Sequence, residues 1–309
     1  MLNRVGTFNH SMVLLNEYQR IQSRITETQT QISSGKVGDT YADVDNRAGV
    51  LAAAKAKTAR TETLMASAKE VQTKLGLQDA QLQHLAELSD DFREAIGNAL
   101  ATGRGETLME TARGIYKSAA SILNTQVDGV YIYGGTRTDI APVNAKTLDE
   151  LEAAPVLAGV FENTSIQQTQ TVEEGVTMET GLLASDLGTG LFGMLRDLAA
   201  MNVGPDGPFG TTLNAAQKTF LEGQMAQIQP VSRELNVFAA ENGVRYNQIE
   251  DVVARHEDTA IELKKFVGDI EDVDLAEAIT RLNQDQAAQQ AAARIIANLQ
   301  DNSLLNYLN

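Results

Sequence analysis

The sequence predicts a mainly α-helical fold, an elongated antiparallel rod or bundle of long heptad helices with a β-hairpin and a small mixed α/β or β-rich inserted outer domain. Two seams predict the rod, because apolar residues recur in alternate steps of four and three through residues 221–270 and 64–99. The insertion is predicted because four of the five prolines fall within residues 142–210, where no heptad pattern continues.

The first seam runs from Leu221 to Ile270 and indicates a helix about 75 Å long, at a rise of about 1.5 Å per residue. Three polar residues interrupt it, namely Ser232, Asn242 and His256. Polar residues at such positions often fix the register of helix pairs. Pro230 removes a backbone donor and clashes with the preceding turn, so one kinked rod and two collinear helices are both compatible with the pattern.

Three helices are expected before the hairpin. A terminal helix over roughly residues 9–33 should end at Gly35, which can adopt the left-handed cap conformation. A second, rod-length helix should begin at Asp45 or Asn46 and end near Ala101, after the irregular segment 36–45. A third should begin at Leu108, and the three should pack at shallow crossing angles.

The hairpin is expected where β-branched and aromatic residues meet glycines. Val130 to Tyr133 favours a strand and the following Gly134 to Thr138 favours a turn. The hairpin residues singled out are Tyr131, Tyr133, Gly134 and Gly135. Within the insertion, alternation from Ile166 to Val172 weakly favours a strand, and leucines at 191, 195 and 198 favour a short helix.

The last helix should begin at Asp274, which is followed three residues later by Glu277 in a pattern typical of a capping box. It should run to about Gln300 with a thin seam of alanines and glutamines, which is poorly stable alone. The predicted division is an N-terminal assembly helix and linker (1–44), a first half of the rod with the hairpin (45–141), the inserted outer domain (142–210), a second half of the rod (211–270) and a C-terminal assembly helix (271–309).

The two terminal helices are natural partners for each other and for neighbouring molecules, because their seams are weak and a single chain offers few other surfaces. The predicted assembly interface consists of Leu14, Tyr18, Ile21, Ile25, Ile32, Leu275, Ile279, Leu282, Ala293, Ile296 and Tyr307.

Composition excludes several classes of function. A net charge of -16 argues against binding to nucleic acid or to anionic membranes, which would both repel the chain. Cysteine is absent, so disulfides and cysteine-based chemistry are excluded. The sequence contains no apolar run of signal-peptide or membrane-spanning length, so we expect no membrane insertion and a cytosolic location, unless export uses a machine that recognises another feature.

Candidate sites for chemistry are weak. His10, His84 and His256 lie far apart in sequence, and the acidic cluster from Asp269 to Glu277 lacks the spacing of a calcium-binding EF-hand. Ser34-Gly35-Lys36 lacks the earlier glycine of a phosphate-binding loop, since Thr30 occupies that position. We therefore expect no cofactor, no metal and no enzyme, and an enzyme within residues 142–210 ranks last among the alternatives.

Three segments near the ends of the chain are distinctive, namely residues 4–7 with Met12, residues 32–36 and the aspartate-rich segment 270–279. In these segments the chain resembles the flagellin superfamily. Residues 129–138 with Pro142, and the closing residues 303–308, resemble more specifically the hook-filament junction family of hook-associated proteins. The segment 37–43 departs from the family's usual asparagine-arginine and serine-aspartate-aspartate-proline run.

The resemblance implies a structural subunit of the bacterial flagellum that links the hook to flagellin. It implies export by the flagellar type III apparatus, an extracellular location and terminal helices that order on polymerisation. The implied partners are other copies of the chain, a neighbouring hook-associated protein, flagellin and an export chaperone. The alternatives are a filament flagellin and, from another class, a cytosolic coiled-coil adaptor.

Overall fold

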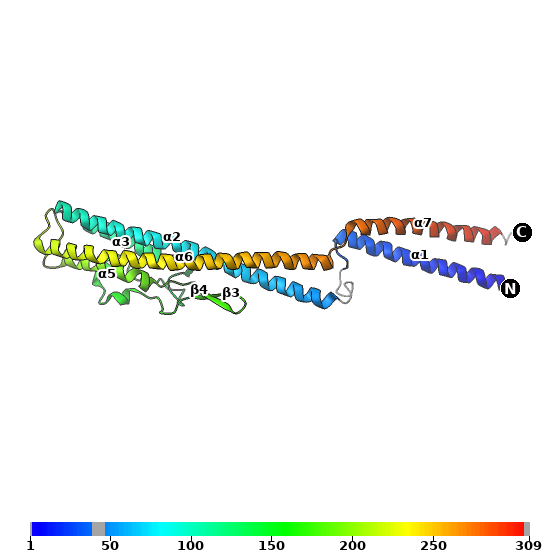
Figure 1. The fold of residues 1–309 in the computed structure, drawn as a ribbon, viewed down its shortest axis with the longest axis horizontal. Helices are drawn as coiled ribbons and strands as arrows, with labels where there is room; N and C mark the ends of the chain where they lie inside the picture. The colour runs from blue at the N-terminus through cyan, green and yellow to red at the C-terminus, as the bar shows by residue number, and fades with distance from the viewer. Residues whose placement is uncertain (1, 39–46, 306–309) are drawn as a thin grey trace. The chain divides into compact units, whose positions relative to one another are not determined.

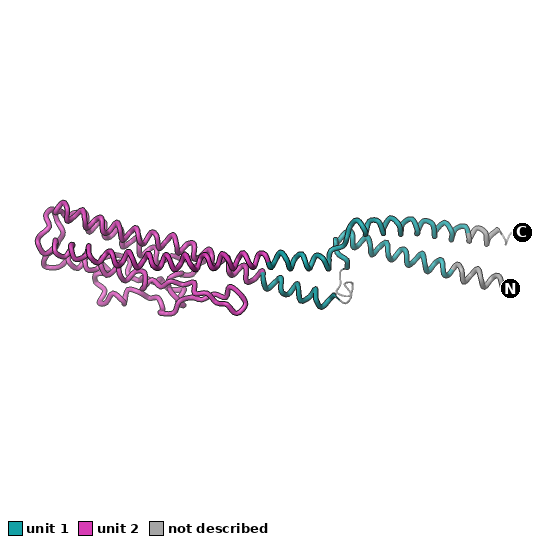
Figure 2. The backbone as a smooth tube through the Cα atoms, in the orientation of Figure 1, with its two compact units in different colours: residues 1–61, 259–309 teal, residues 62–258 magenta. Residues whose placement is uncertain are grey.

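The computed structural model describes residues 2–38 and 47–305, and the chain forms two compact units (Figure 2). The first unit comprises Met1–Thr61 and Thr259–Asn309, and the second comprises Glu62–Asp258. Two long helices, α2 (Ala48–Thr102) and α6 (Ala215–Glu271), contribute residues to both units. The mainly α-helical fold class is therefore confirmed, whereas the five-part division stays a prediction.

The first unit is built around the terminal helices α1 (Leu2–Ser34) and α7 (Leu275–Leu305), which contact each other (Figure 1). Both are longer than predicted, since α1 begins before residue 9 and α7 continues past Gln300. Gly35 ends α1 with a φ of 73° and donates its N–H to the Gln31 carbonyl at 2.9 Å, as the sequence predicts. The expected start of the second helix, at Asp45 or Asn46, lies outside the described residues.

In the second unit, α2 and α6 pack with α3 (Leu108–Leu123) and α5 (Ala184–Val203) around one hydrophobic core. The α6 helix is unbroken and contains Pro230, which rules out two separate helices. Asn242 is fully buried in the seam, and its Nδ2 donates to the Leu75 carbonyl of α2 at 2.9 Å. This directional bond fits the expectation that a polar residue at this position fixes register.

The hairpin exists, but the predicted turn is wrong. Strands β1 (Gln126–Val127) and β2 (Val130–Tyr131) pair antiparallel, so the turn lies at Asp128-Gly129, before the aromatic segment. These two residues have φ values of 51° and 80°, as expected for a two-residue turn of the I′ kind, for which Asp-Gly is a strong signal. Gly134 and Gly135 serve a different purpose, described below.

The insertion packs onto the long helices and shares their core. It contains α4 (Leu148–Ala153), the 3₁₀ helix η2 (Leu157–Val160) and a second hairpin of β3 (Thr169–Glu173) and β4 (Val176–Glu179). The weak strand and the short helix predicted from sequence correspond to β3 and α5. The side chain of Val172 is fully buried in a cluster with residues of α2 and α6.

Candidate assembly site

The two chain segments that flank the terminal helices meet in the first unit. The segment after α1 and the turn between α6 and α7 form an antiparallel bridge at Lys36 and Asp272. Its backbone bonds run from the Val37 N–H to the Glu271 carbonyl at 2.7 Å and from the Val273 N–H to the Gly35 carbonyl at 3.0 Å. The structure thus brings together two of the sequence segments that carry the family resemblance, although they lie more than 200 residues apart.

Glu271 is the electrostatic centre of this bridge. Its carboxylate is bonded to the ammonium group of Lys55, and the ammonium group of Lys36 lies 3.9 Å away. Only 16% of the Glu271 side chain is exposed, so these ion pairs are screened less than surface pairs. The base of the terminal helix pair is therefore held by backbone and charged contacts together.

Asp274 begins α7 as the sequence predicts. Its Oδ1 accepts hydrogen bonds from the backbone N–H groups of Ala276 at 2.9 Å and Glu277 at 3.1 Å. These are donors that the first turn of a helix leaves unpaired, so Asp274 acts as the N-cap.

The face of α1 that is turned away from solvent follows the predicted seam. Ile21, Ile25 and Thr28 are buried, whereas Leu14, Tyr18 and Ile32 are half-buried. The corresponding face of α7 is poorer in apolar groups. It contains buried Ala278 and the half-buried Leu282, Asp285, Gln289, Ala292 and Ile296.

Polar contacts complete this thin seam. The Arg24 guanidinium donates to both oxygens of Asp285, at 2.7 and 3.3 Å, and the side chains of Gln22 and Gln289 are hydrogen-bonded. The bond to Asp285 raises the pKa of Arg24. Sequence reasoning missed this pair, although opposite charges beside the seams of two helices expected to pair were a usable signal.

Several large apolar side chains of the pair are about half exposed or more. On α1 they are Met12, Val13 and Leu15, and on α7 they are Leu275, Ile279 and Ile295. Leu275 and Ile279 are respectively 49% and 48% exposed, so about half of each remains uncovered in the single chain. Scattered exposure is ordinary for soluble proteins, but six such residues on two helices provide apolar area for a further contact.

The predicted interface residues therefore divide into two sets. Within the α1–α7 pair, Ile21 and Ile25 are buried, and Leu14, Tyr18, Ile32, Leu282 and Ile296 are half-buried. Leu275, Ile279 and Ala293 are exposed, and Tyr307 lies outside the described residues. Their role in assembly stays a prediction.

In the second unit, the aromatic and glycine segment after β2 is held by close packing. Tyr133 is buried and its hydroxyl donates to Gln81 Oε1 of α2 at 2.5 Å. A Cβ on Gly134 would lie 2.1 Å from the Arg137 carbonyl oxygen, and one on Gly135 would lie 2.4 Å from Thr164 Oγ1. Gly135 also has a φ of 66°. Both positions therefore require glycine because there is no space for a Cβ, and position 135 also requires it because of the positive φ.

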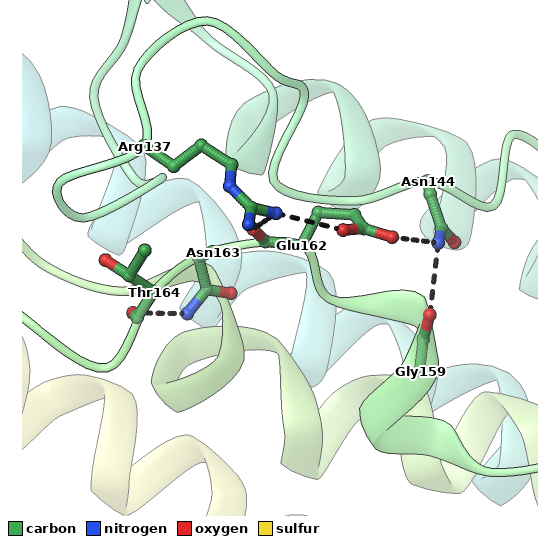
Figure 3. Close-up of polar contacts among 6 residues, drawn as sticks. All are labelled: Arg137, Asn144, Gly159, Glu162, Asn163 and Thr164. Atoms are coloured by element: carbon green, nitrogen blue, oxygen red, sulfur yellow. Dashed lines mark hydrogen bonds and ion pairs between the residues drawn. The ribbon is translucent and has the colours of Figure 1, made fainter.

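A neighbouring polar network ties this segment to the insertion. Figure 3 shows the Glu162 carboxylate between the Arg137 guanidinium, at 3.2 Å, and the Asn144 amide, also at 3.2 Å. The Asn144 amide also donates to the Gly159 carbonyl at 3.0 Å. These contacts join loops and the 3₁₀ helix η2, so they fix the positions of these segments.

Other candidate chemistry is not assembled by the fold. His84 is bonded to Glu87 one turn away, and His256 Nε2 lies 2.8 Å from the Val172 carbonyl, whereas the His10 side chain lies outside the described residues. Within the described part of the chain, no group of three or more metal-binding side chains converges. None of the described helices combines the length and apolar character needed to cross a membrane.

The C-terminal part of the chain matches one protein-family model. Residues 225–308, which span most of α6 and α7, match the model of the bacterial flagellin C-terminal helical region. The matched residues are thus similar to the C-terminal helical region of bacterial flagellins. The match includes Glu271, Asp274 and the α7 face that contacts α1. No curated protein sequence matches the chain.

Solved structures share the fold over more of the chain than residues 225–308. A protein described as a flagellar hook-associated protein from Vibrio parahaemolyticus matches with a TM-score of 0.59 and 19% identity, over 74% of this chain and all of the other. FlgL from Bacillus cereus matches with a TM-score of 0.55 and 14% identity, over 68% and 96%. The flagellar hook-associated protein 3 from Legionella pneumophila matches with a TM-score of 0.56 and 13% identity, over 70% and 98%.

Proposed function

We propose that this chain is a structural, non-enzymatic subunit of the bacterial flagellum that joins the hook to the flagellin filament. The observation that carries the proposal is the paired terminal helices, which combine a flagellin C-terminal region with uncovered apolar side chains. The fold shared with hook-associated proteins favours the junction over other positions in the flagellum.

The physical mechanism is burial of the uncovered apolar groups between neighbouring molecules. Each large apolar side chain that becomes fully buried contributes about 1.5–3 kcal/mol, so half-exposed residues gain roughly half of that. The gain offsets the entropy lost when weakly held helices become fixed in an assembly. Copies of the chain, a neighbouring hook-associated protein and flagellin would supply the covering surfaces. An export chaperone would cover them before assembly.

Export through the flagellar type III apparatus to an extracellular position accompanies this function. The absence of cysteine is compatible with a protein that folds outside the cell without oxidative chemistry. A cytosolic coiled-coil adaptor would stay in the cell, so detection of the protein in sheared flagella and not in lysate separates the two hypotheses.

A filament flagellin is the second candidate, since the matched family model describes flagellins. Immunogold labelling of intact flagella separates the candidates, because a junction subunit labels one narrow band next to the hook and a flagellin labels the whole filament.

The role of the terminal helices is tested by Ile279→Asp. This change places a charge on a side chain that is exposed in the single chain, so the fold should persist while junction labelling is lost. Val203→Asp is the matched control, because Val203 is also exposed but lies at the end of α5. Normal junctions with the Ile279 variant would refute the role of this α7 face.

A further inference from the structure

A groove between α2 and α6 in the second unit is rich in hydrogen-bond donors. It encloses about 330 Å³, and donors on its lining come from Arg93, Gln229, Ser232, Arg233 and Asn236. Asp90 is the one lining carboxylate. Such a lining suits a ligand that accepts hydrogen bonds and has negative charge.

The described residues do not fully neutralise the charge of the groove. Arg93 Nη2 lies 3.1 Å from Asp90 Oδ1, so one guanidinium is paired. Among the described residues, Arg233 has no ion-pair or hydrogen-bond partner. Arginine is the side chain best suited to bind a carboxylate with two parallel hydrogen bonds. The groove therefore has a free guanidinium that fits a carboxylate group.

A hollow of opposite charge lies beside the same helix. It encloses about 550 Å³ between α2, α3 and the loop that joins them, and Asp91, Glu94 and Glu106 line it together with Arg104. Within the described part of the chain, none of these three carboxylates has a hydrogen-bond or ion-pair partner. At 100° per residue, position 91 of α2 points about 100° away from position 90, and position 94 points about 100° away from position 93. Groove and hollow therefore occupy different sides of α2 and overlap in level at residues 90–94, beyond which the hollow extends to Thr102 and the following loop.

We propose that the arginine groove of one molecule binds the acidic hollow of a second copy of this chain. The two surfaces have complementary charge and lie on different sides of α2 with overlapping levels, so two copies can stand side by side. Because the two surfaces differ, the contact is head-to-tail and repeats from copy to copy, which yields rings or helical arrays. This contact deepens the proposed function, on which it rests, by naming a lateral interface outside the terminal helices.

Charge also argues for this occupant. The chain has a net charge of -16, so most orientations of two copies repel each other at low salt. A groove with an excess of arginine is an exception that steers a carboxylate-bearing neighbour into one orientation.

The test is a charge exchange measured by sedimentation velocity of the full chain at low salt and high protein concentration. One variant carries Arg93→Glu and Arg233→Glu, and a second carries Asp91→Arg and Glu94→Arg. We expect each alone to associate at least about tenfold more weakly than the wild type, because attraction becomes repulsion. An equimolar mixture should regain association, since each variant then offers the surface that the other needs.

Arg113→Glu is the control, because Arg113 pairs with exposed Asp149 on another surface. This variant should associate as strongly as the wild type. Unchanged association of either double variant, no recovery in the mixture, or a wild type that remains monomeric would each overturn the proposal. Junction labelling of flagella is a separate measurement. If the charge-exchange variants lose and regain association as expected but junction labelling fails, only the proposed function is refuted.

Discussion

Ile25 offers the sharpest test of the terminal helix pair, because it is one of the few large apolar side chains that the pair buries. The side chain is 6% exposed, so Ile25→Ala removes almost fully buried carbon atoms and leaves a cavity. Such changes cost about 2–4 kcal/mol. The seam around it contains polar Asp285 and Gln289, which cannot compensate for the loss.

The loss should be local to the first unit. Since a factor of ten corresponds to about 1.4 kcal/mol, amide hydrogen exchange in residues 14–32 and 278–296 should accelerate about 30-fold or more. Exchange in α3 should be unchanged, because that helix belongs to the second unit. Mass spectrometry of deuterated peptides measures both regions in one sample.

Ile279→Ala is the matched control, because it removes the same atoms from a side chain that is 48% exposed. In the soluble Ile279→Ala protein, the rate of amide hydrogen exchange in residues 14–32 and 278–296 should change by less than about threefold. The reasoning is refuted if both variants accelerate exchange equally, or if Ile25→Ala lowers protection in α3 as much as in α1.

Three further predictions concern the described contacts. Asp274→Ala removes the α7 cap and should cost about 1 kcal/mol, measured as faster exchange at Ala276 and Glu277, and unchanged exchange there would contradict the capping role. Gly135→Ala should lower the thermal midpoint by several degrees more than Gly175→Ala, because both have positive φ but only the Gly135 position lacks space for a Cβ. Burial lowers the pKa of Lys74 to about 8, so the unfolded chain binds more protons above that value and the free energy of unfolding should rise from pH 8 to pH 9.5. Urea titrations should show a smaller rise for Lys74→Met, and an equal rise would contradict the assignment. Above pH 10 the trend should reverse, since burial raises the pKa of Tyr116 and Tyr133 and their ionisation favours the unfolded state.

The long helices were predictable because the apolar residues of a heptad seam indicate which face of a helix is buried. The same pattern could not choose the buried face of α7. That helix is rich in alanine, and a seam starting at Leu275 and Ile279 is as regular as the observed one starting at Ala278 and Leu282. Contacts with α1, among them the pair of Arg24 and Asp285, select the second, and these contacts depend on tertiary structure.

The turn of the first hairpin was predictable and was missed. Asp128-Gly129 is a strong local signal for a two-residue turn, whereas the turn predicted from the sequence lies at Gly134 to Thr138. In the structure, glycine is needed at positions 134 and 135 for a different reason, because the Arg137 carbonyl and the Thr164 side chain leave no space for a Cβ. Such crowding comes from segments distant in sequence, so no local pattern reports it.

The central claim is that the terminal helix pair is completed by neighbouring molecules. The most direct measurement compares hydrogen exchange of residues 12–34 and 275–298 in the soluble chain and in isolated hooks that carry it. We predict that protection is clearly lower in the soluble chain than on hooks, with the largest gain around Leu275 and Ile279. Equal protection in both states would contradict the claim, because the pair would then be a complete intramolecular structure.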